Sequence, residues 1–377
     1  MNMDNLYNYF LRYNEKINFL TIKNIKIENR EYTNIDFPIN SKVLLKNIKE
    51  NTFKNEISTK YFIEGIILLN AIDSSFNNIE ILNKFLNSFK NDTIINIVKS
   101  KLYFKNLTFD NILYNVLILR GLVVLNKIND YIKKLYIKNL IMILDYLDEN
   151  FKALFLNEIK LELSKLFFKN ENDPYINILY GDLNLKEKFY IKSNSFYVRA
   201  LNFSNDRFLK ENISNKISSI KVKVEIENLL QLIDKFQYEK ALKILSTIND
   251  DKNLDKEDYY WIAYSYNKLN ETNLAIKYYE KSLKLNADFL NIFIELGLLY
   301  YKINKINKAL KIFEDGLNIY IDDEKLMFNK IILELKLNMF EKAKKDIDKI
   351  LLYEDLDNTI MNDILYLKNL YENDLNK

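Results

Sequence analysis

Residues 258–286, DYYWIAYSYNKLNETNLAIKYYEKSLKLN, contain two stretches with apolar residues at helical spacing, separated by a polar turn. Apolar residues that recur every three or four positions lie on one face of a helix. The stretch therefore predicts two amphipathic helices joined as a hairpin. A single hairpin leaves its apolar face uncovered, so we expect further helices of the same kind to pack against it.

Four alanines follow one another at a constant interval in this part of the chain. The sequence contains nine alanines, and Ala241, Ala275, Ala309 and Ala343 are spaced by 34 residues each time. A fixed period of this length is typical of helical repeat arrays. A small side chain lets two helices approach closely while larger apolar neighbours fill the flanks. We therefore expect each alanine to lie where the two helices of a hairpin meet.

The residues around the alanines resemble a known repeat. Residues 293–317, FIELGLLYYKINKINKALKIFEDGL, carry an aromatic residue, a Leu-Gly pair and a tyrosine, followed by an alanine and a phenylalanine. This order at this period resembles the tetratricopeptide repeat, of the bacterial type. The resemblance implies an all-α fold, a right-handed superhelical array of helix-turn-helix repeats. Two features depart from the family pattern: Ala287, Ile321 or Asp355 replaces the usual proline, and Ile331 replaces a small residue.

The expected organisation has three parts. Residues 171–377 are predicted to form the array, with one long connecting helix over residues 205–230 and a closing helix over residues 358–375. Residues 55–170 are predicted to be helical with degenerate repeats. Residues 1–54 form an N-terminal cap segment.

The cap segment contains a short alternating pattern. Ile25 and Ile27, then Ile35 and Phe37, alternate with polar residues on either side of a polar turn. This pattern predicts a small β-hairpin. Helices are expected to begin near Asn40 or Ser41.

The residue inventory excludes many chemistries. The chain contains no cysteine and no histidine, which rules out disulfides, thiolate nucleophiles and histidine bases. Lys and Arg (55) against Asp and Glu (52) leave a net charge of +3 without a block of like charges, so nucleic acid is not an expected partner. No apolar stretch approaches the roughly 20 residues that a membrane span needs. We expect a cytoplasmic protein with no cofactor or metal and without membrane insertion.

Asparagine and lysine are abundant, whereas only five residues are arginine. This usage is typical of a very AT-rich genome. We therefore assign no functional meaning to the asparagine and lysine content.

Several acidic clusters could act either as helix caps or as functional carboxylates. They are Asp148-Glu149, Glu171 with Asp173, Asp250-Asp251 and Asp322-Asp323-Glu324. Most precede predicted helices, where carboxylates bind free backbone amides and the positive end of the helix dipole. Asp173 before Pro174 has the clearest capping pattern. The alternative is an enzyme or small-molecule sensor that uses carboxylates of the N-terminal half.

The resemblance also implies a concave groove lined by the first helix of each repeat. The partner-binding positions that it implies are Tyr260, Tyr264, Lys268, Ile294, Leu298, Tyr301, Lys302, Phe328, Ile332 and Leu335, with Ile226, Leu230 and Ile233 in the first copy. Chaperone-docking members of the family hold a terminal carboxylate with Lys and Asn, but here tyrosine and aliphatic residues take those places. The mostly apolar floor favours a peptide or helix of a protein partner.

The predicted function is a non-enzymatic protein-protein interaction scaffold or adaptor. Two alternatives for the apolar floor stay open. A partner can cover it, or the N-terminal half and the neighbouring repeats can bury it. Trp261, one residue away from the family's aromatic position, fits core packing or partner contact equally well.

Overall fold

The chain forms two compact units. The structure, a computed structural model, describes residues 6–50, 58–248, 254–353 and 356–375. Contacts divide the chain into residues 1–219 and 220–377. Helix α11 (Arg207–Asp234) extends across this boundary and agrees with the predicted connecting helix. The sequence pattern placed further domain borders at residues 54 and 170. The division by contacts does not test these borders, and they stay predictions.

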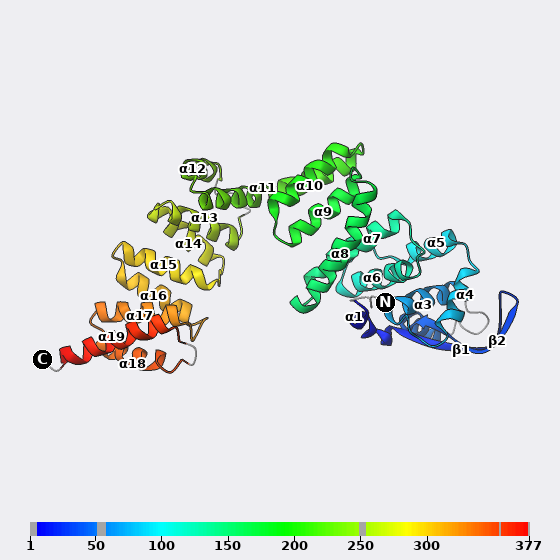
Figure 1. Ribbon diagram of the computed structural model, residues 1–377, viewed down its shortest axis with the longest axis horizontal. Coiled ribbons are helices and arrows are strands. Elements are labelled where there is room, and N and C mark those ends of the chain that lie inside the picture. The colour runs from blue at the N-terminus through cyan, green and yellow to red at the C-terminus, as the bar shows by residue number, and fades with distance from the viewer. Residues whose placement is uncertain (1–5, 51–57, 249–253, 354–355, 376–377) are drawn as a thin grey trace. The chain divides into compact units, whose positions relative to one another are not determined.

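The described part of the N-terminal unit is helical apart from one β-hairpin (Figure 1). In α3 every residue from Phe62 to Ile72 is buried, as expected for a helix that is apolar on all sides. The helices of this unit are α1 (Tyr7–Leu11), α2 (Ser41–Lys49), α3 (Thr59–Ile72), α4 (Ile79–Asn87), α5 (Asn91–Lys101), α6 (Phe109–Val124), α7 (Asp130–Ile143), α8 (Glu149–Lys169), α9 (Pro174–Lys186) and α10 (Tyr190–Phe203), with short 3₁₀ turns at Asn14–Lys16 and Leu144–Tyr146.

The hairpin consists of β1 (Ile17–Ile27) and β2 (Arg30–Asn40), which pair antiparallel. Its two-residue turn places Glu28 and Asn29 at φ values of 48° and 65°. Positive φ at both positions matches the twist of paired strands. The predicted hairpin is confirmed, and α2 follows it directly.

Two glycines let neighbouring backbones lie directly on the core helices. A Cβ atom added to Gly65 in α3 would lie 1.9 Å from the carbonyl oxygen of Pro38 in β2. A Cβ atom added to Gly121 in α6 would lie 2.0 Å from the carbonyl oxygen of Ile67 in α3. Real side chains do not approach a backbone oxygen this closely, so both contacts depend on glycine.

The C-terminal unit is a succession of helix hairpins that ends in α19 (Figure 1). α13 packs on α14, α15 on α16 and α17 on α18. α19 coincides with the closing helix predicted from the sequence. The helices of this unit are α12 (Tyr238–Thr247), α13 (Lys256–Lys268), α14 (Thr272–Lys284), α15 (Leu290–Lys302), α16 (Ile306–Leu317), α17 (Glu324–Lys336), α18 (Phe340–Ile350) and α19 (Asn358–Leu375).

The periodic alanines lie at equivalent places in the second helix of each hairpin. Ala241, Ala275, Ala309 and Ala343 belong to α12, α14, α16 and α18, and all four are fully buried. If each alanine lies where two helices cross, all four alanines should be buried, as they are. The predicted fold class, an all-α helical repeat array with a small N-terminal hairpin, is confirmed.

Within a hairpin, a small residue of the first helix accommodates a large one of the second. A Cβ atom on Gly297 would lie 2.3 Å from the ring of Phe313, and one on Gly181 would lie 2.3 Å from the ring of Tyr197. The pair in the α17–α18 hairpin is Ile331 and Ile347, which share one buried cluster. A larger first residue faces a smaller second one there, which explains why Ile331 can depart from the family pattern.

Asparagine closes the first helix of three successive hairpins. Asn270, Asn304 and Asn338 have φ values of 61°, 57° and 58°, at the same 34-residue period as the alanines. The next amide in each case bonds back five residues, as from Lys305 to the Tyr300 carbonyl at 2.9 Å. This is the left-handed helix end that glycine or asparagine favours. Asparagine thus substitutes for glycine in a chain with five glycines, and its role at these positions is structural.

Acidic residues cap helices where the sequence predicted them. Asp173 accepts hydrogen bonds from the amides of Tyr175 and Ile176, and Pro174 begins α9. Asp148 and Asp323 likewise cap α8 and α17. Asp250 and Asp251 lie outside the described residues. Within the residues that are described, no cluster of three or more acidic groups could hold a metal ion.

Replacing Ala309 with leucine is expected to destabilise the C-terminal unit by about 1–3 kcal/mol, because three added heavy atoms must fit a fully packed crossing. Trp261, the only tryptophan, belongs to this unit, so its fluorescence during urea unfolding reports the change. Lys311→Leu, at an exposed position of the same helix, is the matched control. Equal losses in both variants would contradict the register. Ala287, in the connection between α14 and α15, is 5% exposed and therefore also buried, so it is not a suitable control position.

Candidate functional site

The first helices α13, α15 and α17 contribute one candidate surface, which we call the first-helix face. It consists of the predicted groove residues Tyr260, Tyr264, Lys268, Ile294, Leu298, Tyr301, Lys302, Phe328, Ile332 and Leu335. Two positions recur in all three helices at 34-residue spacing: one is Tyr260, Ile294 and Phe328, and the other is Tyr264, Leu298 and Ile332. Equivalent positions of equivalent helices therefore form rows across the face.

Polar contacts connect neighbouring helices of this face. The Asn267 side-chain amide donates a hydrogen bond of 2.6 Å to the Glu295 carboxylate, which joins α13 to α15. The Lys336 ammonium donates one of 3.2 Å to the Tyr301 hydroxyl and lies 4.5 Å from the centre of that ring, which joins α15 to α17. The three helices thus present these side chains to a common surface. Glu295 is a member of the face that the sequence did not single out.

Aromatic rings gather at the α13 end of the face. Trp261 contacts Tyr260 and Tyr264 edge-to-face, with ring centres 5.0 and 5.7 Å apart. Tyr260 also contacts Tyr279 and Phe289 and is 8% exposed. Trp261 is 38% exposed. Tyr260 therefore belongs to the interior, whereas the Trp261 ring lies at the surface and can contact a partner.

A buried tyrosine lies under this aromatic group. Tyr279 of α14 is fully buried, and its hydroxyl has no hydrogen-bond partner among the described residues. Burial raises the pKa of the Tyr279 phenol, and the negative charge of Glu295 raises it further. The phenol therefore stays protonated, and it supplies neither a base nor a nucleophile near neutral pH.

The predicted groove residues divide into an interior set and an open set. Tyr260, Ile294, Phe328 and Leu335 belong to or pack against the buried clusters of the unit. Leu298 and Tyr301 are 42% and 37% exposed, Lys268 and Lys302 are exposed, and Tyr264 and Ile332 are partly exposed. In the first copy Ile226 and Ile233 are buried. Ile294, Phe328 and Leu335 pack against these clusters but are partly exposed as well.

One charged cluster between α17 and α18 has no counterpart in the sequence analysis. Lys330 pairs with Glu334 at 2.8 Å and also with Asp346. Glu334 is fully buried, and burial raises the pKa of its carboxyl group. Lys330 and Glu334 are four residues apart on one helix, a spacing that favours an ion pair. Nothing in the sequence indicates that Asp346 of α18 joins this pair.

A buried carboxylate also lies in the N-terminal unit, beside a cavity of about 360 Å³. Glu64 accepts hydrogen bonds from the Asn40 amide at 3.0 Å and the Tyr114 hydroxyl at 2.9 Å, and it pairs with Lys101 at 2.8 Å. Three protein donors thus satisfy this carboxylate. Its surroundings are those of a structural ion pair and not of a free acid or base.

The fold and the first-helix face define a helical-repeat scaffold, a class whose stacked repeats present extended binding surfaces. Comparison with protein families identifies residues 259–289, which include most of α13 and all of α14, as a tetratricopeptide repeat. The chain thus contains a tetratricopeptide repeat over these residues, and the resemblance noted in the sequence is confirmed there. None of the described helices is both long and apolar enough to cross a membrane.

Solved structures of tetratricopeptide proteins are similar to the chain at low identity. A MamA protein is 17% identical, with 49% of this chain and 97% of that chain covered and a TM-score of 0.33. YrrB, described as a TPR protein with an unusual peptide-binding site, is 18% identical over 55% and 97% of the chains, with a TM-score of 0.34. PilF of Pseudomonas aeruginosa is 15% identical over 57% and 90%, with a TM-score of 0.39. No curated protein sequence matches the chain significantly. Likenesses this weak say nothing about function.

Proposed function

We propose that the chain is a non-enzymatic, cytoplasmic protein-interaction scaffold that binds a peptide or helix of a partner protein through the open set of the first-helix face. The observation that carries the proposal is the row of Tyr264, Leu298 and Ile332, one apolar residue per repeat. All three are at least partly accessible, and Leu298 is 42% exposed. Exposed apolar residues that line up across several elements favour a binding surface over scattered surface residues.

The row also suggests what kind of segment would fit it. Contacting helices lie about 8–10 Å apart, and a peptide in the polyproline II conformation advances about 3.1 Å per residue with three residues per turn. Apolar side chains three residues apart in a partner would therefore meet successive repeats. Lys268 and Lys302 are exposed beside the row, so acidic residues in the partner would add electrostatic attraction.

Leu298→Asp is expected to abolish partner binding without unfolding the chain, because it places a charge in the centre of an apolar row at a position that is already accessible. The measurement is affinity capture with the tagged full-length chain from the native organism, read by mass spectrometry. Far-UV circular dichroism of both proteins checks the fold. Tyr264→Ala, which removes an aromatic anchor, is expected to weaken the same interaction.

Leu352→Asp is the matched control, since Leu352 is 81% exposed and lies after α18, outside the face. A partner that is retained by Leu298→Asp, or lost equally with both aspartate variants, would reject the first-helix face as the binding surface.

A further inference from the structure

A second groove lies in the N-terminal unit, between α7, α9 and the first turns of α11. Its cavity volume is about 700 Å³, and its lining includes Leu135, Ile178 and Leu209 as an apolar floor. Tyr131 and Tyr175 line it as well and are 50% and 55% exposed. This volume and this mixture of apolar floor and accessible rings are typical of ligand-binding clefts.

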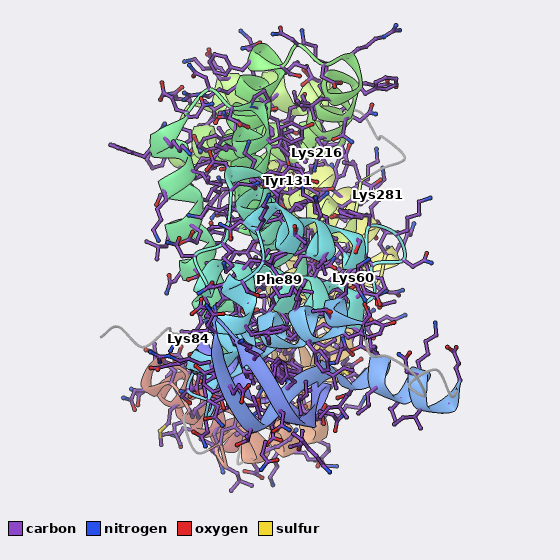
Figure 2. The ribbon with its side chains drawn as sticks, turned by 90° about the vertical axis from the view of Figure 1, so that its right-hand side faces the viewer. Lys60, Lys84, Phe89, Tyr131, Lys216 and Lys281 are labelled. Atoms are coloured by element: carbon purple, nitrogen blue, oxygen red, sulfur yellow. The ribbon has the colours of Figure 1, made fainter. Side chains whose placement is uncertain are left out.

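The charged lining of this groove is mainly basic. It contains Lys134, Lys138 and Lys216 against a single acidic residue, Asp182. Figure 2 labels Tyr131 and Lys216, which line the groove from α7 and α11. An anionic group that enters the groove would therefore meet lysines from two helices.

Two of the three lysines are neutralised within the protein. Lys216 pairs with Asp182 at 2.6 Å, and Lys134 pairs with Asp173, the N-cap residue of α9. Lys138 is exposed and has no carboxylate partner among the residues that the structure describes. One cation therefore remains uncompensated beside an apolar floor.

We propose that this groove binds a short segment of a partner protein in which an acidic residue is flanked by apolar side chains. The carboxylate would pair with Lys138, and the apolar side chains would cover the floor and contact the rings of Tyr131 and Tyr175. A small inorganic anion would leave the apolar floor open to water, so it uses only part of the site. Nucleic acid fits poorly, because the lining contains no arginine and includes an aspartate.

The inference is independent of the first-helix face, since every lining residue belongs to the other unit. An experiment that rejects binding at one site therefore does not reject binding at the other. A chain with both sites would hold two segments at once, which is the arrangement of a scaffold.

Fluorescence polarisation of the full-length chain with a defined probe tests the proposal. The probe is a fluorescein-labelled octapeptide of alternating glutamate and leucine, beside the same peptide with glutamine in place of glutamate. We expect the acidic peptide to bind more tightly than the neutral one, and added salt to weaken its binding. Lys138→Glu is expected to weaken binding of the acidic peptide by about tenfold or more, because a charge-assisted contact becomes a repulsion.

Lys84→Glu is the matched control. Lys84 is an exposed lysine of α4 with no carboxylate partner among the described residues, and its replacement makes the same change in net charge away from the groove (Figure 2). Unchanged binding in Lys84→Glu together with the loss in Lys138→Glu supports the proposal. If Lys138→Glu fails to fold, Lys138→Gln serves in its place, with a smaller expected loss. Equal binding of the two peptides, or equal losses in the two glutamate variants, overturns it. A dimer in sedimentation that Lys138→Glu dissociates would also overturn it, since a second copy would then be the occupant.

Discussion

Replacing Gly121 with alanine is expected to destabilise the N-terminal unit by about 3 kcal/mol or more, although alanine favours helix formation by up to about 1 kcal/mol over glycine. The new Cβ atom would lie 2.0 Å from the Ile67 carbonyl oxygen. A flexible side chain could rotate away, but this oxygen belongs to the backbone of α3, whose residues from Phe62 to Ile72 are all buried. Relief requires α3 and α6 to move apart, which opens the core along both helices.

Two optical signals separate the units in this experiment. Far-UV circular dichroism follows helices of the whole chain, whereas Trp261 fluorescence follows the C-terminal unit alone. We expect Gly121→Ala to shift the dichroism transition in urea to lower concentration and to leave the fluorescence transition in place. A fluorescence transition that moves by the same amount would show that the helices of the two units unfold together.

Gly316→Ala provides the comparison, because the atoms nearest to its added Cβ are side-chain atoms of Leu326 and Phe293, at 2.9 Å. The Leu326 methyl group can rotate, whereas the Phe293 Cβ atom moves only with its backbone, and the gain in helix propensity offsets part of the remaining strain. We expect a loss of about 1–2 kcal/mol, smaller than that of Gly121→Ala. A loss at Gly316 as large as that at Gly121 would mean that backbone contact is not the deciding feature.

The periodic part of the fold could be predicted from the sequence because a repeat places the same packing problem at the same interval. Ala241, Ala275, Ala309 and Ala343 solve it identically, so spacing alone located the helix crossings. The asparagines at helix ends recur with the same period, but asparagine is so abundant in the sequence that these positions do not stand out. At Phe236, 34 residues before Asn270, a bulky residue has a φ of 57°, which no residue preference would have predicted.

The candidate site could be predicted only in part. Helical periodicity placed Tyr260 and Leu298 on the first helices, but exposure depends on how neighbouring helices stack, and Tyr260 is covered by Tyr279 and Phe289. The groove at Lys138 was missed altogether. Its residues come from three helices with no shared spacing, and only the tertiary structure brings them together.

Replacing Lys330 with methionine is expected to cost the C-terminal unit about 3–5 kcal/mol near pH 7, because two acidic side chains lose the cation between them. Glu334 is fully buried, and the side chains of Lys330 and Asp346 are 15% and 16% exposed. Methionine keeps the length of the aliphatic stem, so the loss reports charge more than packing. Trp261 fluorescence in urea measures it. Lys342→Met on the exposed side of α18 is the control and should change stability by less than about 0.5 kcal/mol.

The sign of the pH dependence distinguishes lost charge from lost packing. Burial already raises the pKa of Glu334 above its ordinary value of 4.5. The positive charge of Lys330 favours the ionised carboxylate, so removal of this lysine raises the pKa of Glu334 further. A raised pKa in the folded state means that folding takes up a proton, so this carboxyl group stabilises the fold fully below its ordinary pKa. That stabilisation is lost as the pH rises through the folded-state value. The destabilisation of Lys330→Met should therefore shrink between about pH 7 and about pH 5. A loss that is the same at both pH values would identify packing of the lysine stem, and not the buried charge, as its cause.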